Sequence, residues 1–334
     1  ILVVLTNKGY IKRTTSDTFK SQNRGGVGIK GMTTNDEDFV EHMINLSTHD
    51  YILFFTDKGK VYRLKGYEIP EFSRQSKGIP IVNLLQVEKD ERVNAVIQIN
   101  REEECKYLLF ATEGGVVKKT LISEFANIRN SGKICISLRD NDKLIDVKKT
   151  TGNDLVLLGS DSGRMVKFNE DEIRVMGRTA SGVRGISLDG SKCICSEIVK
   201  EDDTILLVTE KGYGKQTKVS EYRQTRRGSK GVKAMNITDK NGSLVSVKIV
   251  QDNQELVIMT NSGMTMRMPL DQISLLGRVT QGLRLINLKD NQKVSTISLV
   301  EKEEVSESAE EETNNLSENV SNEDENITEI KETE

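Results

Sequence analysis

A short turn motif recurs six times along this chain of 334 residues. Each copy starts with Thr or Ser, continues with polar residues or Gly, and closes on a glycine. The copies occupy residues 6–9, 56–59, 112–115, 160–163, 209–212 and 260–263. Their closing glycines are 50, 56, 48, 49 and 51 residues apart. A period of this size is typical of repeat architectures in which each copy is one supersecondary unit.

Each turn motif stands between two predicted strands. An apolar run precedes it, as at residues 52–55, 155–158 and 205–208. One such run could be a buried helix, but six of them before the same turn favour buried strands joined to the next strand by a hairpin. The second strand mixes apolar and basic residues, so we expect one face in the core and a cationic face on the surface. The cations of this second strand are Lys12, Arg13, Arg63, Lys118, Lys119, Lys167 and Arg267.

A second glycine follows the turn glycine at a nearly fixed distance. The gap is 19 residues for Gly28, Gly78, Gly182, Gly231 and Gly282, and 17 residues for Gly132. Four residues before this glycine stand Arg24, Arg74, Arg178, Arg227 and Arg278, with Arg129 beside the exception, Ile128. Further cations, just beyond the glycine or within the same loops, are Lys30, Lys77, Lys133, Arg184, Arg226, Lys230, Lys233 and Arg284. A lone arginine is usually a solvated charge, but five at one register position predict a cationic rim.

The richest of these loops is residues 22–31, which contains Gln22, Arg24, Gly25, Gly26, Gly28, Lys30 and Gly31. Glycine lets the backbone approach a ligand closely, and exposed amides beside Arg and Lys suit phosphate. In isolation, a tight turn that needs glycine would be the simpler interpretation. The recurrence of the loop favours an anion-binding role.

Composition supports a basic body with an acidic tail. From Glu301 onward there are 14 acidic and two basic residues and little that is apolar, which predicts a disordered segment at 301–334. Positions 1–300 then hold 46 basic and 37 acidic residues. We hypothesise that the tail competes with a bound polyanion for the rim, as against merely solubilising the chain; deleting it and measuring the affinity for that polyanion tests this.

Other features narrow the class further. The four cysteines, Cys105, Cys135, Cys193 and Cys195, lack metal-site spacing and are expected to be buried thiols in a reducing compartment. His42 and His49 are expected on the surface. No apolar run is long enough to cross a membrane, and no signal-peptide pattern is present. The chain opens in mid-strand without an initiator Met, so we expect a fragment of a longer protein.

The repeat predicts an all-β fold, with residues 1–300 forming six four-stranded blades around an axis, as in propellers. Whether strands stay within a blade or are exchanged between neighbours is left open by the period. A rim of cations fits a polyanion that runs around the outside, and phosphate contacts position a duplex without reading its sequence.

The loop at 22–31 resembles the box motif of the C-terminal domain of the DNA gyrase A subunit. That motif usually runs Gln, Arg or Lys, Arg, Gly, Gly, Arg or Lys, Gly; Asn23 and Val27 stand here where the family tends to have cations. The degenerate copy at residues 226–231 and the six turn motifs extend the resemblance over roughly residues 1–300.

This resemblance implies a six-bladed β-pinwheel with strand exchange that bends and chirally wraps DNA without sequence specificity. In the family, the wrap presents a second DNA segment to the cleavage gate, so that ATP-driven strand passage introduces negative supercoils. The resemblance implies no catalysis and no cofactor in this fragment: the nucleophilic Tyr, ATP and Mg²⁺ belong to other parts of a type IIA topoisomerase. It also implies gyrase A and B partners in the bacterial cytoplasm, at the nucleoid.

Three alternatives stay open. The C-terminal domain of the A-type subunit of topoisomerase IV is similar but bends DNA with fewer or degenerate blades, and the box counts against it. A protein-binding propeller would show an aromatic, hydrophobic surface in place of a cationic rim. A propeller enzyme would need carboxylates at the channel, and no Asp, Glu and His cluster stands out.

Overall fold

The computed structural model describes residues 1–15, 38, 40–73, 76–100, 104–262, 264–289 and 291–301. These residues form short strands and single-turn 3-10 helices. The strands are β1 (Leu2–Thr6), β2 (Tyr10–Thr14), β3 (Val40–Asn45), β4 (Tyr51–Thr56), β5 (Lys60–Lys65), β6 (Ile79–Pro80), β7 (Val93–Ile99), β8 (Tyr107–Thr112), β9 (Val116–Leu121), β10 (Lys133–Ile134), β11 (Leu144–Thr150), β12 (Leu155–Ser160), β13 (Arg164–Asn169), β14 (Val183–Arg184), β15 (Cys193–Val199), β16 (Thr204–Thr209), β17 (Tyr213–Lys218), β18 (Val232–Lys233), β19 (Leu244–Val250), β20 (Gln254–Thr260), β21 (Thr265–Pro269), β22 (Leu283–Arg284) and β23 (Val294–Glu301). The 3-10 helices are η1 (Gly66–Glu68), η2 (Ile81–Asn83), η3 (Ile122–Phe125), η4 (Glu170–Glu172), η5 (Val219–Glu221) and η6 (Leu270–Gln272).

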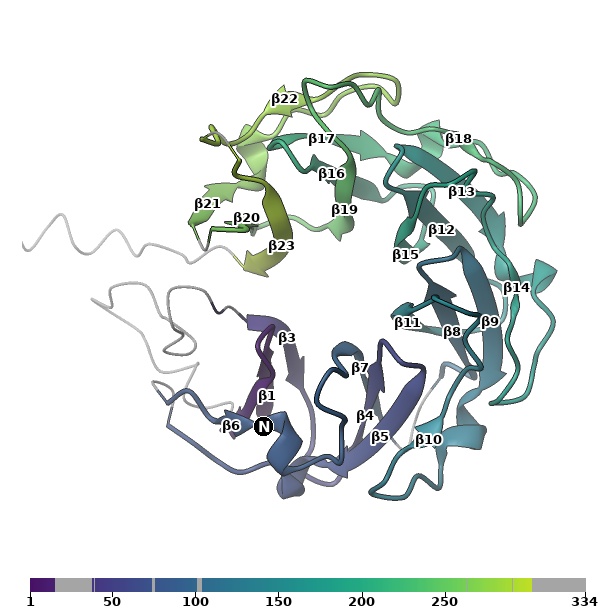
Figure 1. The fold of residues 1–334 in the computed structure, drawn as a ribbon, viewed down its shortest axis with the longest axis vertical. Coiled ribbons are helices and arrows are strands. Elements are labelled where there is room, and N and C mark those ends of the chain that lie inside the picture. The colour runs from purple at the N-terminus through teal and green to yellow at the C-terminus, as the bar shows by residue number, and fades with distance from the viewer. Residues whose placement is uncertain are drawn as a thin grey trace, which may run out of the picture.

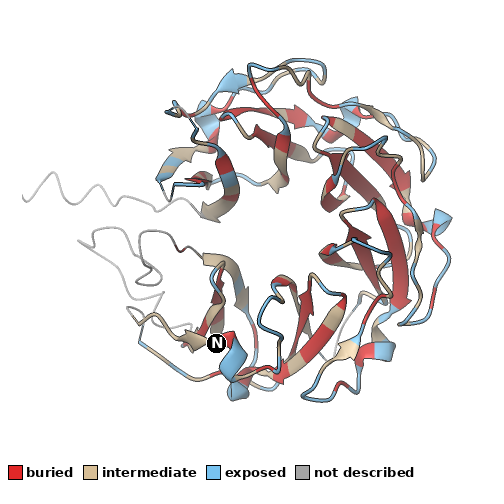
Figure 2. Cartoon of the chain, in the orientation of Figure 1, coloured by how far each residue is buried: buried red, intermediate tan, exposed pale blue. Residues whose placement is uncertain are grey.

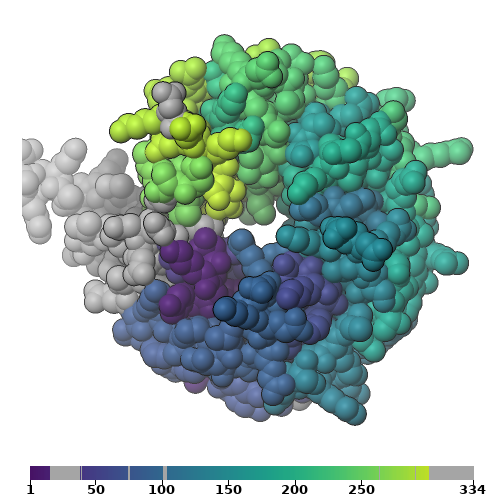
Figure 3. All heavy atoms as spheres, viewed as in Figure 1, coloured from purple at the N-terminus to yellow at the C-terminus, as the bar shows by residue number. Residues whose placement is uncertain are grey.

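The strands form six antiparallel sheets that stand as blades around a central opening (Figures 1 and 3). The strands nearest the opening are β3, β7, β11, β15, β19 and β23, one from each blade. At the periphery lie β6, β10, β14, β18 and β22, each only two residues long. The all-β, six-bladed fold predicted from the repeat is therefore confirmed.

The peripheral strand of each complete blade comes from the next repeat. β6 of the second repeat pairs with β2 of the first, with Pro80 opposite Tyr10. In the same way β10 pairs with β5, β14 with β9, β18 with β13 and β22 with β17. The sequence period left this question open, and the pairing shows that neighbouring blades exchange strands. In the sixth blade the described strands are β21, β20 and β23.

The turn motif owes its recurrence to two hydrogen bonds. In all six copies the Thr or Ser hydroxyl accepts from the N–H of the residue after the glycine, at 3.1–3.4 Å. In the first five copies the glycine N–H bonds to the Thr or Ser carbonyl, and the glycine has φ between 73° and 79°. A three-residue loop that ends in a left-handed residue is a common hairpin connection, and glycine takes that conformation without a steric penalty.

The apolar core lies between blades. Leu108 and Phe110 of β8 pack with the second blade, whereas Leu109 and Ala111 pack with the fourth, so both faces of the sheet contribute. Figure 2 shows the buried residues along the strands of the blades. Between blades 2 and 3, Phe55 packs edge-on against Phe110 with ring centroids 5.6 Å apart, and Phe125 of η3 contacts both rings. All three rings are buried. Each buried aromatic of this kind contributes roughly 1.5–3 kcal/mol. Since neighbouring blades share these clusters, the ring is held together by side-chain packing as well as by exchanged strands.

The cysteine and histidine predictions have different outcomes. Cys135, Cys193 and Cys195 are buried free thiols as expected, and burial raises the pKa of Cys135 and of Cys193 to about 12. Cys105 is only partly buried. His49 is exposed as expected, and His42 on β3 is half-buried: its Nε2 is buried, and burial lowers the pKa of the imidazole to about 4. No helix in the described ranges is long and apolar enough to cross a membrane.

Candidate nucleic-acid interface

The exchanged strands carry the predicted rim cations outward. Lys133, Arg184, Lys233 and Arg284 are the basic residues of β10, β14, β18 and β22, which are the peripheral strands of blades 2 to 5 (Figure 1). Arg184, Lys233 and Arg284 are exposed, and Lys133 is half-buried. Arg284 is also fixed in place, because its Nη2 donates to the Tyr213 hydroxyl at 2.9 Å. Four successive blades thus show a cation at the same structural position.

The loop before each exchanged strand is called a rim loop here. The rim loops are residues 128–132, 177–182, 226–231 and 277–282, together with the described residues 73 and 76–78 of the second repeat. Each ends on the second glycine found in the sequence, and the structure explains that glycine. A Cβ on Gly182 would lie 2.5 Å from the Val117 carbonyl oxygen, and one on Gly231 would lie 2.0 Å from that of Met165. The glycine is needed where the rim loop crosses the preceding blade, so strand exchange alone accounts for it.

The arginine four residues before this glycine is hydrogen-bonded both through its guanidinium and through its backbone N–H. The Nη1 of Arg178 donates to the carbonyl of Ile134, on the exchanged strand of the preceding repeat. In the same way, the Nη1 of Arg227 donates to the backbone carbonyl of Arg184, and the Nη1 of Arg278 donates to that of Lys233. All three arginines are half-buried. They therefore tie each rim loop to the previous one while leaving part of the guanidinium at the surface.

A glutamate that sequence reasoning missed completes this arrangement. Glu124, Glu172 and Glu221 stand nine residues after the turn glycine, in η3, η4 and η5. Each carboxylate accepts from the backbone N–H of the next repeat's arginine, Arg178, Arg227 or Arg278, at 2.7–2.8 Å. The constant register, readable from the aligned repeats, was the available signal. A carboxylate beside a cationic loop would be expected to weaken anion binding. Here it binds the backbone N–H of the rim arginine and so positions the loop.

Four lysines predicted to face solvent are buried instead, and that prediction is wrong for them. Lys12 and Lys118 have no exposed surface, and Lys119 and Lys167 have 5% and 2%. Their ammonium groups bind carbonyls of the next repeat: Lys119 binds that of Glu170 at 2.9 Å, and Lys167 binds that of Val219 at 3.3 Å. Because blades cover both faces of each sheet, a basic residue at this register bridges blades and does not reach the surface.

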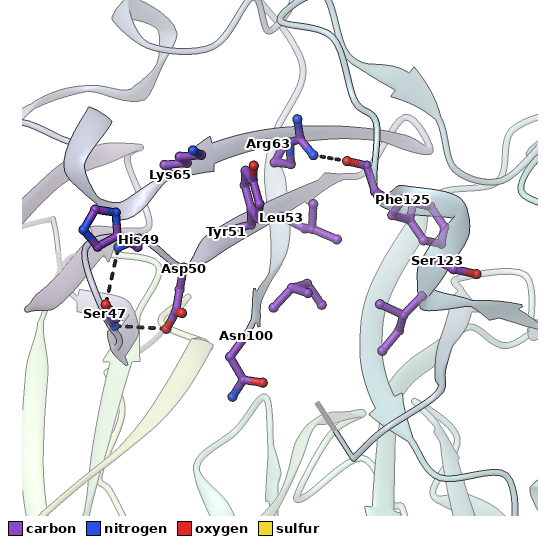
Figure 4. Close-up of a pocket in the computed structure, with 13 residues that line it drawn as sticks. Ser47, His49, Asp50, Tyr51, Leu53, Arg63, Lys65, Asn100, Ser123 and Phe125 are labelled. Carbon is purple, nitrogen blue, oxygen red and sulfur yellow. Dashed lines mark hydrogen bonds between the residues drawn. The ribbon is translucent and has the colours of Figure 1, made fainter. Parts of the chain in front are cut away.

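The remaining second-strand cations lie closer to solvent. Arg13 and Arg63 are half-buried and Arg267 is exposed. Arg63 lines a cavity of about 800 Å³ between blades 2 and 3, where its guanidinium stacks on the Tyr51 ring at 4.3 Å and Nη1 donates to the Ala126 carbonyl (Figure 4). Arg13 pairs with Glu71 at 3.7 Å, and Arg267 with Glu255.

The other predicted site residues divide into two groups. Arg129, Arg226 and Lys230 are exposed on rim loops, and Lys77 lies with its ammonium 3.8 Å from the centroid of the Tyr10 ring. Of the acidic tail predicted at 301–334, Glu301 is the last residue of β23 and the rest falls outside the described residues. The same is true of the following predicted residues: Gln22, Arg24, Gly25, Gly26, Gly28, Lys30, Gly31 and Arg74. Within the described ranges, no group of three or more His, Cys, Asp or Glu residues could hold a metal ion.

Fold and rim together define an all-β, strand-exchanged propeller with a cationic outer edge. The chain belongs to the family described as DNA gyrase C-terminal domain, β-propeller, whose model matches residues 1–47, 50–100, 106–151, 154–194, 203–251 and 254–301. The DNA gyrase A subunit of Staphylococcus epidermidis is 47% identical over 302 residues, which cover 89% of this chain and 34% of that protein. The chain thus spans about a third of the length of the curated relatives it matches.

Two solved structures share the fold. The C-terminal domain of DNA topoisomerase IV superposes with a TM-score of 0.79 at 26% identity, covering 90% of this chain and 93% of the other. The DNA gyrase A C-terminal domain superposes with a TM-score of 0.69 at 27% identity, covering 90% and 99%. The match to the gyrase A domain agrees with the expectation of a gyrase-type C-terminal domain.

Proposed function

We propose that this chain binds duplex DNA along its rim and bends it into a chiral wrap, without reading base sequence. The observation that carries the proposal is the repeated cation of the exchanged strands β10, β14, β18 and β22, which lie at the periphery of successive blades. Regularly placed cations match the regularly placed phosphates of a duplex, and phosphate contacts fix position and orientation without sequence information.

Several rim contacts are needed, because bent DNA resists. Smooth bending of a 20–30 base-pair site by 40–90° costs on the order of 1–6 kcal/mol. A single loop is a poor source of that energy, but Arg184, Lys233 and Arg284 act on one continuous edge together with the loop cations Arg226 and Lys230. The logarithm of affinity should fall by about 0.9 for each neutralised phosphate per tenfold rise in salt.

In the whole protein we propose that this wrap serves negative supercoiling by a gyrase holoenzyme. The gyrase A N-terminal region and the gyrase B subunit would be its partners in the bacterial cytoplasm. Chemistry that depends on ATP and Mg²⁺ would belong to those parts, and the role of this chain would be to hold and direct the DNA.

The second candidate function is DNA bending of the topoisomerase IV kind, without a chiral wrap. The superposition on the topoisomerase IV C-terminal domain, with a TM-score of 0.79, favours it. The two functions differ in the sign and size of the linking-number change that the domain imposes, so one measurement separates them.

The test is ligation of nicked circular DNA in the presence of residues 1–334, followed by removal of the protein and measurement of the linking number. We expect a shift toward positive supercoils that is lost in the variant R184A/K233A/R284A. The matched control is K192A/K200A/K293A, which removes the same charge beside the inner strands β15 and β23. Binding without a shift would favour simple bending, and equal losses in both variants would contradict a specific rim.

A further inference from the structure

Odd and even repeats differ three residues after the turn glycine. Repeats 1, 3 and 5 have Lys12, Lys118 and Lys215 at this position. Repeats 2, 4 and 6 have Tyr62, Val166 and Met266. The three lysines have no exposed surface, although their side chains end in a charge. A buried ammonium is costly unless several acceptors surround it, so its partners show what it is for.

Most of the partners are carbonyl oxygens of the next repeat's rim loop. The Lys215 ammonium donates to the carbonyls of Gly277, Arg278 and Thr280 at 2.9, 2.7 and 3.3 Å, and the Thr280 hydroxyl lies at 3.2 Å. The acceptors therefore surround a single nitrogen. They include the carbonyl of Arg278, one of the predicted rim arginines.

The other two lysines repeat this geometry. Lys118 donates to Arg178 O at 2.6 Å, to Gly177 O at 3.5 Å and to Cys135 O. Lys12 donates to Ser76 O at 2.9 Å and to Ser73 O at 3.3 Å. The rim loops of repeats 2, 4 and 6 thus each rest on one buried ammonium, which is called a lysine cage here.

A lysine cage changes the electrostatics of its loop. Carbonyl oxygens carry partial negative charge and would repel phosphate if they faced outward. In the cage they point inward to the ammonium, while the Nη1 of Arg178 and of Arg278 is held on the neighbouring exchanged strand. The backbone N–H groups of Arg178 and Arg278 are already bound to Glu124 and Glu221, so what the loop offers to an anion is the rest of each guanidinium.

Rim loops over even blades are held differently. In the loop at 226–231, the Gly228 N–H bonds to Gly185 O, and Arg164 of blade 4 donates to the carbonyls of Lys230 and Gly231. Below that loop, Val166 occupies the cage position. In the described ranges, isolated parallel bridges also occur only after odd repeats: Arg13 with Glu71, Lys119 with Val175 and Gln216 with Leu275. Odd and even junctions therefore differ in how the rim loop is held, although both share the exchanged strand.

We propose that Lys12, Lys118 and Lys215 are positioning residues for the DNA interface: each holds carbonyls of the following rim loop inward, and Lys118 and Lys215 thereby direct Arg178 and Arg278 toward the phosphate backbone. This inference rests on the proposed function, because it assigns the buried lysines to the same rim. A role in fold stability alone would not need them, since Val166 fills the same position with an apolar side chain at 0% exposure.

The charge at these sites is maintained against burial. Burial lowers the pKa of Lys118 and of Lys215 to about 8. Glu124 and Cys135 oppose this shift at Lys118 while Arg178 adds to it, and at Lys215 Glu221 opposes it while Arg278 adds to it. Both ammonium groups are still mostly protonated at pH 7. The acid in each case is the glutamate that binds the backbone N–H of the rim arginine, which joins the lysine and the arginine in one network.

The test is a double-mutant cycle on the full chain, with DNA affinity as the readout. K118M and R178A should each weaken binding by about three- to tenfold, and R178A should add little in the K118M background, because coupled residues are non-additive. Arg227 lies on a rim loop without a lysine cage, so R227A should weaken DNA binding by the same factor in the wild type and in K118M. Additive losses for K118M and R178A, or a K118M variant that binds as wild type, would overturn the proposal.

A second readout separates this proposal from the proposed function. In K118M without DNA, amide hydrogen exchange should rise in residues 177–182 and stay unchanged in 226–231. If exchange behaves so while R178A, R227A and R278A bind DNA normally, the cage is real and the DNA-binding rim is wrong. If K118M does not fold, K215M with R278A provides the same cycle at an independent cage. Unchanged exchange in both cages would overturn the inference.

Discussion

The junction between blades 3 and 4 and the junction between blades 4 and 5 share a backbone and differ in what fills it. In both junctions, the last glycine of the rim loop lies against a backbone carbonyl of the preceding blade. In both, a glutamate accepts a hydrogen bond from the backbone N–H of a rim arginine. Beneath the first lie Lys118 and the buried pair Lys119–Glu170; beneath the second lie Val166 and Lys167, whose partner Glu201 is exposed. Strand exchange thus fixes the backbone geometry of the junction, while the side chains that fill it can be either polar or apolar.

The largest expected effect comes from a substitution at the junction between blades 3 and 4, which contains the buried Lys119–Glu170 pair. Glu170 is fully buried and accepts from Thr150 Oγ1 and from the N–H groups of Gly152 and Asp154, besides lying 3.7 Å from Lys119. Glu170→Ala should lower the free energy of unfolding by about 3–5 kcal/mol, because it leaves a buried lysine uncompensated.

The matched change at the other junction is Glu201→Ala. The Glu201 side chain is 56% exposed, so we expect a loss of under about 1 kcal/mol in chemical denaturation. The double variant K119M/E170L should recover part of the loss, because removing both charges avoids an unpaired one, while Thr150 Oγ1 and the N–H groups of Gly152 and Asp154 still lose their acceptor. Equal losses at both junctions would show that the buried Glu170 contributes no more to stability than the exposed Glu201.

The glycines test what the two junctions have in common. Gly182→Ala and Gly231→Ala both place a methyl group against a backbone carbonyl at positive φ, so each should cost at least about 2 kcal/mol in thermal unfolding. Gly190 also has positive φ, but no atom lies within 4 Å of the place that an added methyl group would take, and Gly190→Ala should cost only about 1 kcal/mol. A large difference between Gly182 and Gly231 would mean that strand exchange is not equally tight at the two junctions.

The pH dependence of stability distinguishes the caged junctions from the others. The folded pKa of Lys118 and of Lys215 is about 8, below that of an unfolded lysine. Between pH 8 and about 10.4 the unfolded chain holds more protons, so stability should rise with pH by up to about 1.4 kcal/mol per unit for each lysine. The difference in unfolding free energy between wild type and K118M or K215M should grow over that range. A constant difference would show that these pKa values are not lowered.

The smallest effect concerns an exposed rim cation. Lys230 pairs with Asp189 at 2.6 Å, but both side chains are more than half exposed. Lys230→Ala should change stability by less than about 1 kcal/mol, and it should reduce the salt slope of DNA binding by roughly one phosphate. Titrations at several salt concentrations measure the slope, and an unchanged slope would place the DNA away from this loop.

Much of the fold was predictable from the sequence because its signals are local. The turn motif needs a hydroxyl and a left-handed residue, and both are visible as Thr or Ser and Gly. The positions of the rim loops follow from the second glycine. Arg184, Lys233 and Arg284 were predicted on the rim and are exposed there.

What the sequence hid depends on neighbours distant in the chain. Alternation along a strand separates core from surface only when one sheet face meets solvent, whereas here both faces meet other blades. Lys118, Lys119 and Lys167 therefore looked like surface cations. The exchange of strands was also hidden, since a two-residue strand such as β14 has the same sequence whichever blade it completes.

Strand exchange also governs how this chain can be divided. A cut in the exposed turn near Asp202 falls between two repeats, yet the strand that completes blade 4, β18, lies beyond it. The first fragment would keep β13 with an open hydrogen-bonding edge, which invites aggregation. The second fragment carries the missing piece, so the two should reassociate when mixed, as in a split-protein complementation pair. In this chain the boundaries between sequence repeats do not coincide with the boundaries between sheets, so a cut between two repeats always divides a blade that exchanges its strand across it.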